Sequence, residues 1–300
     1  MGILSLCSVS ILALEVDIPL LSIEGANWTK EESAYIRLLN KKGSIKVATR
    51  IISTVYLPQK DGSITGFHYN VLKEFADLAK IDLDIKLVSW NDYFHKNAED
   101  LEKAKLDLNY SYVPSLIEDV DLYLDGITEL PWREKMFDII KYIPSRHMII
   151  SRFENHPKQI SDLNNKSCVM AQNTSMALNL SKLKDDYRLN FNCISVTDSE
   201  KMKMMDEMVA EGKVDFTVYD SDRAFSSLMN FDNLTILWPV SEIQMMGWAI
   251  NKKNKMLKNI LDKYISYAQK NAILDKYWKR SYGVSFIDYM KVLNIGVPKH

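Results

Sequence analysis

Residues 126–143, GITELPWREKMFDIIKYI, are the stretch from which the rest of the chain is interpreted. The stretch opens with turn-forming residues and carries one arginine, Arg133, between Pro-Trp and Glu-Lys. It ends in a largely apolar run at 137–142, shortly before Pro144. A planar guanidinium group can bind a carboxylate through two parallel hydrogen bonds, which an ammonium group cannot do. Arg133 is therefore either a ligand-binding arginine or an ordinary surface arginine in a loop.

Alternating strands and helices are expected on both sides of this stretch. Apolar residues recur at helical spacing in some segments and alternate in others, and turn residues separate the segments. Strand–helix–strand units imply parallel strands joined by right-handed crossovers. The expected elements are helices at 29–43, 66–80, 174–184, 198–211 and 254–278, and strands at 44–49, 81–90, 105–112, 166–172, 188–196 and 214–219.

This order predicts an α/β protein of two lobes joined by a hinge. In open α/β sheets, ligands bind in a crevice at the carboxyl ends of the strands, so a cleft between the lobes is the expected site. The expected division is residues 1–26 as a signal or anchor with a linker, residues 27–143 with 248–300 as lobe one, and residues 144–247 as lobe two.

Composition and motifs argue against several function classes. The 300 residues are 47% hydrophobic and 26% charged, which is ordinary for a globular protein. A net charge of −1 gives no basic face for nucleic acid. The five histidines lack metal-ligand spacing, and no P-loop, dinucleotide fingerprint or G-x-S-x-G motif occurs. We expect no metal, no cofactor and no enzymatic activity, with a degenerate lobed enzyme as a minor alternative.

The three cysteines are Cys7, Cys168 and Cys193. Cys168 and Cys193 fall in two expected strands of the same lobe and could be neighbours. Free cysteine is commonly buried, so buried free thiols are favoured over a disulfide.

The N-terminal 16 residues are apolar over the length of a signal-peptide core and too short to span a bilayer. They lack a basic region at the start, and Leu6 is bulky for the lipoprotein cleavage box that Cys7 suggests. A first buried strand is the alternative. An export signal is favoured, which implies a periplasmic or other extracytoplasmic location, with a membrane tether as an option.

Several segments, taken in order, resemble bacterial extracellular solute-binding proteins of the polar-amino-acid class. The resemblance covers about residues 44–283 and implies a periplasmic-binding-protein-like, or Venus-flytrap, fold. Two positions depart from the family: Asn70 stands where Asp is usual, and Thr128 is farther from Arg133 than the family's Thr. The segments are DGSITGFHYNVLKEFA at 61–76, the stretch at 126–143, GKVDFTVYD at 212–220, and KYWKRSYG at 276–283.

The resemblance also implies a set of ligand-binding residues. Arg133 would hold a carboxylate, and Asp220 would receive an ammonium group. The turn Asn173-Thr174-Ser175 would offer hydroxyl and backbone N–H donors, although Asn173 replaces the usual Gly. Further positions expected to line the cleft are Thr128, Tyr56 and Trp90.

Each of these positions also has a structural interpretation. Asp220 or Ser221 could cap the following helix, and the turn at 173–175 has the residue types that caps select. Tyr56 and Trp90 could equally be core aromatics.

Two functional hypotheses follow. The first is binding of a small zwitterion, an amino acid or a relative, by a monomer that serves a membrane permease or a membrane sensor. The second comes from residues 276–293, KYWKRSYGVSFIDYMKVL, which resemble the non-catalytic module of membrane-bound lytic transglycosylases. That resemblance implies a regulatory module that binds a peptide or muropeptide, with no catalytic domain expected in this chain.

Overall fold

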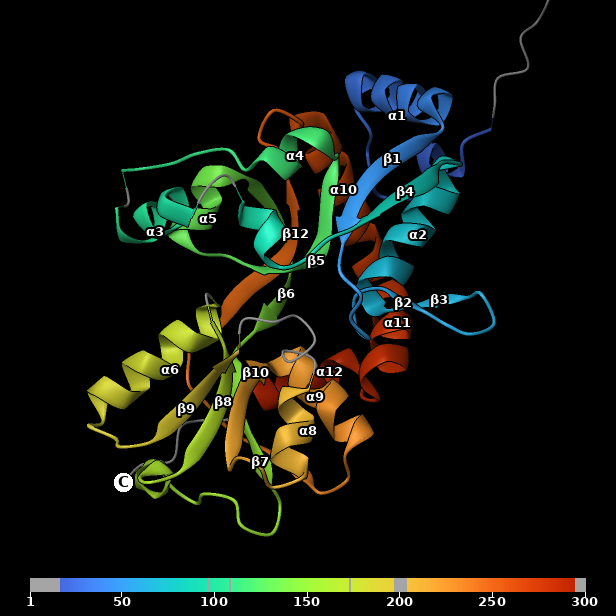
Figure 1. Ribbon diagram of the computed structural model, residues 1–300. Helices are drawn as coiled ribbons and strands as arrows, with labels where there is room; N and C mark the ends of the chain where they lie inside the picture. The colour runs from blue at the N-terminus through green and yellow to red at the C-terminus, as the bar shows by residue number, and fades with distance from the viewer. Residues whose placement is uncertain (1–16, 96–97, 108, 173, 197–203, 295–300) are drawn as a thin grey trace, which may run out of the picture.

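Two five-stranded sheets form the framework of the computed structural model, which describes residues 17–95, 98–107, 109–172, 174–196 and 204–294 (Figure 1). The first sheet has the order β4-β1-β5-β12-β6, with β1 parallel to both of its neighbours and β12 antiparallel to both of its own. Its strands are β1 (Ser44–Thr49), β4 (Asp82–Leu87), β5 (Leu122–Thr128), β6 (Asp138–Ser145) and β12 (Gln244–Ile250).

The second sheet has the order β11-β7-β10-β8-β9. Strands β10, β8 and β9 are parallel, and β7 runs antiparallel between β10 and β11. Its strands are β7 (His147–Arg152), β8 (Ser167–Ala171), β9 (Asn192–Val196), β10 (Phe216–Asp220) and β11 (Leu234–Pro239).

Cys168 and Cys193 form a disulfide, which corrects the expectation of free thiols. They are direct partners in the parallel register of β8 and β9. That pairing brings the two side chains to the same place on the sheet, a relation that sequence spacing alone does not reveal. Cys7 lies outside the described residues.

Helices cover both faces of each sheet (Figure 1). One face of the first sheet packs against α1, α2, α10 and α11, and the other against α3, α4 and α5. The helices and short elements are η1 (Pro19–Ser22), α1 (Lys30–Lys42), β2 (Leu57–Pro58), β3 (Ile64–Thr65), α2 (Phe67–Ala79), η2 (Asn91–Phe94), α3 (Ala98–Leu106), α4 (Ser115–Asp119), α5 (Pro131–Met136), η3 (Ile160–Leu163), α6 (Ser175–Asp186), α8 (Met205–Ala210), α9 (Ser221–Asn230), α10 (Lys255–Lys270), α11 (Ile273–Tyr282) and α12 (Phe286–Leu293).

Local signals in the sequence are confirmed at α1. The Thr29 side chain accepts a hydrogen bond from the Glu32 N–H, and the Thr29 N–H donates to the Glu32 carboxylate. Gly43 ends the helix in the left-handed conformation that glycine tolerates. The capping box thus fixes the start of α1 and the point at which β1 follows.

Two expected elements were wrong. Residues 105 and 106 end α3, and the described residues 107 and 109–112 contain no strand. Tyr112 is buried there because its hydroxyl donates to the Phe94 carbonyl, so its burial does not reflect sheet pairing. The long helix expected at 254–278 is broken at Ala272, whose left-handed backbone separates α10 from α11. Of the helix expected at 198–211, residues 198–203 lie outside the described residues.

The two sheets are joined by strands that run side by side. Only Arg146 separates β6 in the first sheet from β7 in the second. The chain returns between β11 and β12, and Gln244 at the start of β12 pairs with Ser145 at the end of β6. The two crossings therefore lie next to each other, which is the geometry of a hinge.

We expect Gly247→Ala to destabilise the fold strongly. Gly247 lies at an irregularity where β12 pairs with β6, and a Cβ there would be 1.7 Å from the Ile140 carbonyl oxygen. Backbone must shift to relieve that overlap, so we expect a loss of at least about 2 kcal/mol in the free energy of unfolding, measured by urea denaturation. Gly126→Ala is the control, because its Cβ would meet nothing closer than Met246 at 3.6 Å. Equal losses in the two variants would contradict this account.

Candidate functional site

A cavity, partly open to solvent, lies between the two sheets and is lined from both. Most of its polar residues stand at or just beyond strand ends, where α/β folds place ligands. The first-sheet side contributes Arg50, Ile52, Thr54, Val55, His68, Trp90, Asp125, Gly126, Thr128 and Met246. The second-sheet side contributes Ala171, Thr174, Ser175, Met176, Met205, Tyr219, Asp220, Asp222 and Arg223.

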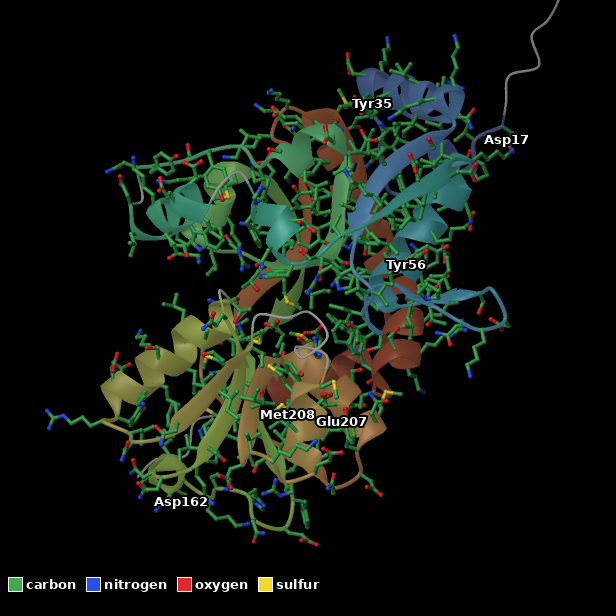
Figure 2. All side chains as sticks on the ribbon, in the orientation of Figure 1. Asp17, Tyr35, Tyr56, Asp162, Glu207 and Met208 are labelled. Carbon is green, nitrogen blue, oxygen red and sulfur yellow. A yellow bond between two sulfur atoms is a disulfide. The ribbon has the colours of Figure 1, made fainter. Side chains whose placement is uncertain are left out.

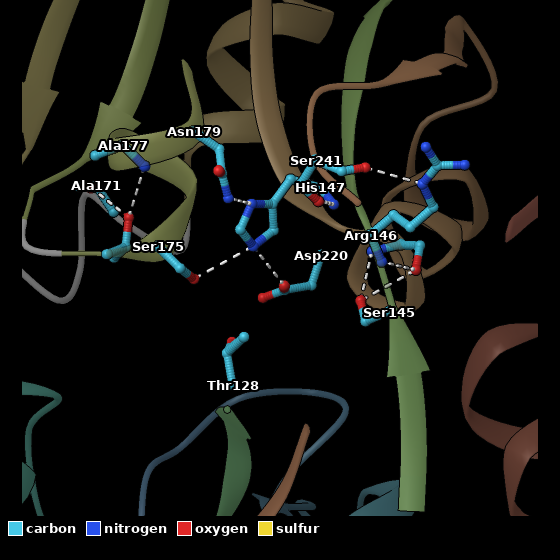
Figure 3. A network of polar contacts seen from close by, with 12 residues as sticks. Thr128, Ser145, Arg146, His147, Ala171, Ser175, Ala177, Asn179, Asp220 and Ser241 are labelled. Atoms are coloured by element: carbon cyan, nitrogen blue, oxygen red, sulfur yellow. Dashed lines mark hydrogen bonds and ion pairs between the residues drawn. The ribbon is translucent and has the colours of Figure 1, made fainter. Parts of the chain in front are cut away.

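Asp220 ends β10 and faces the cavity. It occupies the N-cap position of α9, yet its side chain makes no capping hydrogen bond. Its Oδ1 lies 3.3 Å from His147 Nε2, and no closer partner of that oxygen is found among the described residues (Figure 3). The helix-cap interpretation of this carboxylate therefore has no support in the contacts. Thr128 stands opposite, on the first-sheet side (Figure 3).

His147 connects Asp220 to helix α6. Its Nε2 is 3.2 Å from Ser175 Oγ, and its Nδ1 is 2.8 Å from Asn179 Nδ2 (Figure 3). The Nε2 atom therefore lies between the Ser175 hydroxyl and the Asp220 carboxyl. The ring thus holds the carboxylate in place from behind the cavity wall.

The hydroxyl groups of Thr174 and Ser175 are engaged within the fold. Thr174 Oγ1 donates to the Ala171 carbonyl and accepts from the Ala177 N–H, which is the helix-cap role. Ser175 Oγ contacts His147. Both residues line the cavity, so backbone N–H groups at the start of α6 are the donors that this turn offers to a ligand. Asn173 lies outside the described residues.

An ion pair between Arg50 and Asp125 dominates the first-sheet wall. Arg50 Nε donates to Asp125 Oδ2 at 2.5 Å and Nη2 to Oδ1 at 3.0 Å. Burial works to raise the pKa of the Asp125 carboxyl, but the Arg50 charge and hydrogen bonds hold that pKa below its ordinary value. The Arg50 guanidinium also lies 4.7 Å from the centre of the Trp90 ring. The arginine is therefore fixed at the cavity by two neighbours.

Arg133 lies behind this wall and does not line the cavity. Its side chain is 1% exposed, and Nη1 donates to the Thr128 carbonyl at 3.0 Å. The guanidinium sits about 5 Å from the rings of Trp90, Phe94 and Trp132. Burial lowers the pKa of Arg133 to about 10, with the charges of Asp220 and Asp125 acting in the opposite direction. The surface-loop interpretation is wrong, and direct ligand contact by Arg133 stays a prediction.

His68 presents a single tautomer to the cavity. Trp248 Nε1 donates to His68 Nδ1 at 3.0 Å, and the Tyr142 hydroxyl lies 2.8 Å from the same nitrogen. Burial lowers the pKa of His68 to about 4, so the ring is neutral near pH 7. Because an indole N–H can only donate, Nδ1 is the acceptor and Nε2 carries the proton. His68 therefore offers an N–H donor to a ligand.

Asp222 is a second acidic residue in the wall below Asp220. It is 5% exposed, and its Oδ2 lies 3.3 Å from the Tyr282 hydroxyl of α11. Burial, and next the nearby charge of Asp220, raise the pKa of Asp222 to about 7. The sheet edge thus combines one carboxylate exposed to the cavity with one that exchanges its proton near neutral pH.

The structure brings together most of the predicted site residues. Thr128, Trp90, Thr174, Ser175 and Asp220 line the cavity. Tyr56 does not: it is buried and packs edge-on against Tyr69 near β2 (Figure 2), as the core interpretation of this aromatic would have it.

The sequence interpretation missed four charged residues and one histidine of the cavity. Arg50 directly follows β1, a position at a strand end that could have identified it, whereas Asp125 lies within β5. Asp222 and Arg223 come shortly after the end of β10, so their position at a strand end could also have identified them. His68 gave no signal, since its role depends on contacts with distant residues. The missed residues are Arg50, His68, Asp125, Asp222 and Arg223.

Comparison with known proteins finds relatives among cell-wall enzymes. The chain is 26% identical over 258 residues to membrane-bound lytic murein transglycosylase F of Pseudomonas fluorescens. The matched segment covers 84% of this chain and 49% of that protein. The enzyme of the same name from Ectopseudomonas mendocina is 25% identical over 282 residues, 92% of this chain and 53% of that protein. The chain spans about half the length of these curated relatives. No family model matches it.

Solved structures of amino-acid-binding proteins share the fold. An ancestral cationic amino acid solute binding protein superimposes with a TM-score of 0.63 at 18% identity, over 83% of this chain and 99% of that one. An amino acid ABC transporter substrate-binding protein, AbpA from Streptococcus pneumoniae, superimposes with a TM-score of 0.62 at 18% identity. The match covers 82% of this chain and 98% of that one. The predicted two-lobed, periplasmic-binding-protein-like fold is confirmed, and so are the two resemblances found in the sequence. In the described part of the chain, none of the helices combines the length and apolar character needed to cross a bilayer.

The raised pKa of Asp222 predicts a pH-dependent difference in stability between wild type and Asp222→Asn. A carboxyl whose folded pKa is about 7, against an ordinary 3.8, binds its proton more tightly in the folded state. Its stabilising contribution is present at acid pH and is lost as pH rises through 7. From pH 5 to pH 8, the free energy of unfolding of wild type should therefore fall by roughly 2–3 kcal/mol relative to that of the variant. Parallel urea-denaturation profiles across this range would show that Asp222 ionises normally.

Proposed function

We propose that the chain binds a small zwitterionic solute, an amino acid or a close relative, in the cavity between its two sheets. The observation that carries this proposal is the carboxylate of Asp220. It stands at the cavity without a capping hydrogen bond, and His147 orients it. An ammonium group is the ligand chemistry that matches such an acceptor, because charge-assisted hydrogen bonds are the strong ones. The motif around 212–220 supports the same role.

The carboxylate of the ligand needs a cationic partner on the opposite wall, and we propose Arg50. Arg50 lines the cavity, whereas Arg133 lies behind Trp90 and supports Thr128 through its carbonyl. Asp125 and Trp90 hold the Arg50 guanidinium in position, which lowers the entropic cost of binding. The N–H groups of α6 and the Nε2–H of His68 would add donors from both sides.

Closure of the two lobes would complete the site. We propose that residues 27–143 with 248–300 move against residues 144–247, by rotation about the crossings at Arg146 and between β11 and β12. A ligand that touches Arg50 and Asp220 binds the closed form more tightly than the open one, and this difference in affinity drives closure.

An extracytoplasmic location suits this role. The disulfide between Cys168 and Cys193 supports it, because such bonds persist in oxidising compartments. A monomer that delivers its ligand to a membrane permease, or presents it to a membrane sensor, is the proposed output.

A second candidate is a regulatory module that binds a peptide or muropeptide, and the curated relatives favour it. They are named lytic murein transglycosylases, and they match 84% and 92% of this chain.

A thermal-shift screen tests the proposal and separates the two candidates. The ligands are the common L-amino acids, short peptides and a muramyl peptide. Stabilisation by free amino acids supports solute binding, because a ligand that binds the folded state raises the melting temperature. Stabilisation by the muramyl peptide alone would favour the regulatory module. A chain that responds to none of these ligands would overturn both.

Asp220→Asn should weaken binding of any amino acid found in the screen while leaving the fold intact. The ligand's ammonium would lose its charged acceptor, at a cost on the order of 2–5 kcal/mol in binding free energy by calorimetry. The matched control is Asp215→Asn in the same segment. Asp215 accepts from the N–H and hydroxyl of Ser167 and does not line the cavity, so this variant should lose stability and keep its affinity. Unchanged affinity in Asp220→Asn would exclude Asp220 as the ammonium site.

Arg50→Lys and Arg133→Lys distinguish the two arginines. If Arg50 holds the carboxylate, Arg50→Lys should lose about 1.5–3 kcal/mol of binding free energy, because an ammonium cannot reproduce the fork. Arg133→Lys should reduce stability, since it removes a guanidinium packed among three rings, with a smaller effect on affinity. Calorimetry below the melting temperature of each variant measures this. The opposite ranking of the two affinities would assign the carboxylate to Arg133.

A further inference from the structure

The Asp222 carboxyl is buried in the cavity wall with an incomplete set of partners. It is 5% exposed and lines the cavity. Its Oδ2 lies 3.3 Å from the Tyr282 hydroxyl, and its Oδ1 forms no well-aligned hydrogen bond among the described residues, although the backbone N–H groups of Arg223 and Asp222 also act on the carboxyl. Buried carboxylate oxygens are almost always hydrogen-bonded. The Oδ1 atom can therefore accept a hydrogen bond from a donor group of a ligand.

The surroundings of Asp222 add negative charge, which backbone N–H groups at the start of α9 and the Tyr282 hydroxyl offset only in part. Asp220, two residues earlier, is a second carboxylate in the same wall. The next residue, Arg223, places its guanidinium 4.2 Å from the Tyr219 ring and donates to the Tyr219 hydroxyl. In the described part of the chain, no ion pair joins Asp222 to a cation.

Besides Asp220, three tyrosines on neighbouring elements interact electrostatically with Asp222 in the described part of the chain. Tyr142 of β6, Tyr282 of α11 and Tyr289 of α12 all sense its charge. Burial, and next the charge of Asp222, raise the pKa of each phenol well above its usual value, so these side chains are neutral. Across the cavity, Arg50 is held by Asp125. Neutral neighbours leave the negative charge of Asp222 available to a ligand.

We propose that Asp222 forms a second cation subsite and that the ligand is dibasic: an amino acid whose side chain carries an ammonium or guanidinium group. The inference rests on the proposed function, because the α-ammonium then occupies Asp220 and leaves the side-chain cation for Asp222. Two carboxylates close together in a poorly solvated wall repel each other, and a second positive charge relieves that repulsion. A neutral side chain would leave Asp222 unmatched on closure.

Binding at this subsite is linked to a proton. The carboxyl of Asp222, with its pKa of about 7, holds a proton over part of the neutral range. A cation that binds the ionised form displaces this proton, so affinity for a dibasic ligand should rise from about pH 6 to about pH 8. A ligand that lacks the side-chain cation should show no such rise from this group.

Calorimetry on the full chain with L-lysine and L-norleucine tests the subsite. The two ligands have side chains of equal carbon length and differ in the terminal ammonium group. L-arginine is a third ligand, which tests a guanidinium group in place of the ammonium. Wild type should bind lysine at least about tenfold more tightly than norleucine at about pH 8. Repeating the titration in buffers of different ionisation enthalpy should reveal proton release with lysine near pH 7 and little with norleucine. In Asp222→Asn, the preference should fall to within about threefold and the proton release should disappear.

Asp206→Asn is the matched control. Asp206 is a buried aspartate of the same lobe whose Oδ2 accepts from the Ser227 hydroxyl at 2.8 Å, and it does not line the cavity. This variant should lose stability and keep the preference for lysine, which separates a structural effect from a binding effect.

The outcomes distinguish this inference from the function on which it rests. Equal affinities of wild type for lysine and norleucine would overturn the subsite and leave amino-acid binding intact. A preference for lysine that survives in Asp222→Asn would do the same, because the cation would then bind elsewhere. Failure of wild type to bind any amino acid would overturn the proposed function together with the subsite.

Discussion

The structure depends on a narrow polar junction where two strands pass between the sheets. Ser145, Arg146 and His147 carry the chain from the first sheet into the second. The hydroxyls of Ser145 and Ser221 lie 3.1 Å apart, and the Arg146 N–H donates to the Ser221 hydroxyl. Ser221 stands between Asp220 and Asp222, so the acidic wall of the cavity is attached directly to the hinge. Any rotation of the lobes therefore moves both carboxylates relative to Arg50 and His68.

The C-terminal helices form a third link across this junction. The Tyr289 hydroxyl of α12 donates to the Pro144 carbonyl and lies 2.8 Å from the Ser221 hydroxyl. Arg146 Nη1 donates to the Leu293 carbonyl, and Val292 packs against the core of the second sheet. The proposed rotation of the lobes about the crossings would have to preserve or exchange these contacts. In Figure 1, α11 and α12 lie beside α9 at this level.

The charges of the cavity are arranged before any ligand arrives. Asp125 holds Arg50, His147 orients Asp220, and Tyr142 and Trp248 fix the tautomer of His68. Each of these side chains takes its partner from its own side of the cleft. Such preorganisation lowers the cost of binding, because the ligand does not have to order the wall. Asp222 differs, since one of its oxygens has no hydrogen-bond partner among the described residues and its pKa is about 7.

The sequence by itself determined the two-lobed α/β architecture and much of the cavity edge. Capping residues and apolar periodicity are local signals, so α1 and most strands could be predicted. Thr128, Thr174 and Asp220 were predicted from the resemblance to solute-binding proteins, which places them at the ligand cleft. Tertiary structure decided the rest. Whether Arg133 points to solvent or into a cage of three aromatic rings depends on residues 90–94 and 132 meeting around it. The disulfide depends on strand register, and the partners of Asp222 come from a helix about 60 residues further along the chain. Burial and electrostatic environment are sums over such distant neighbours, which no local pattern encodes.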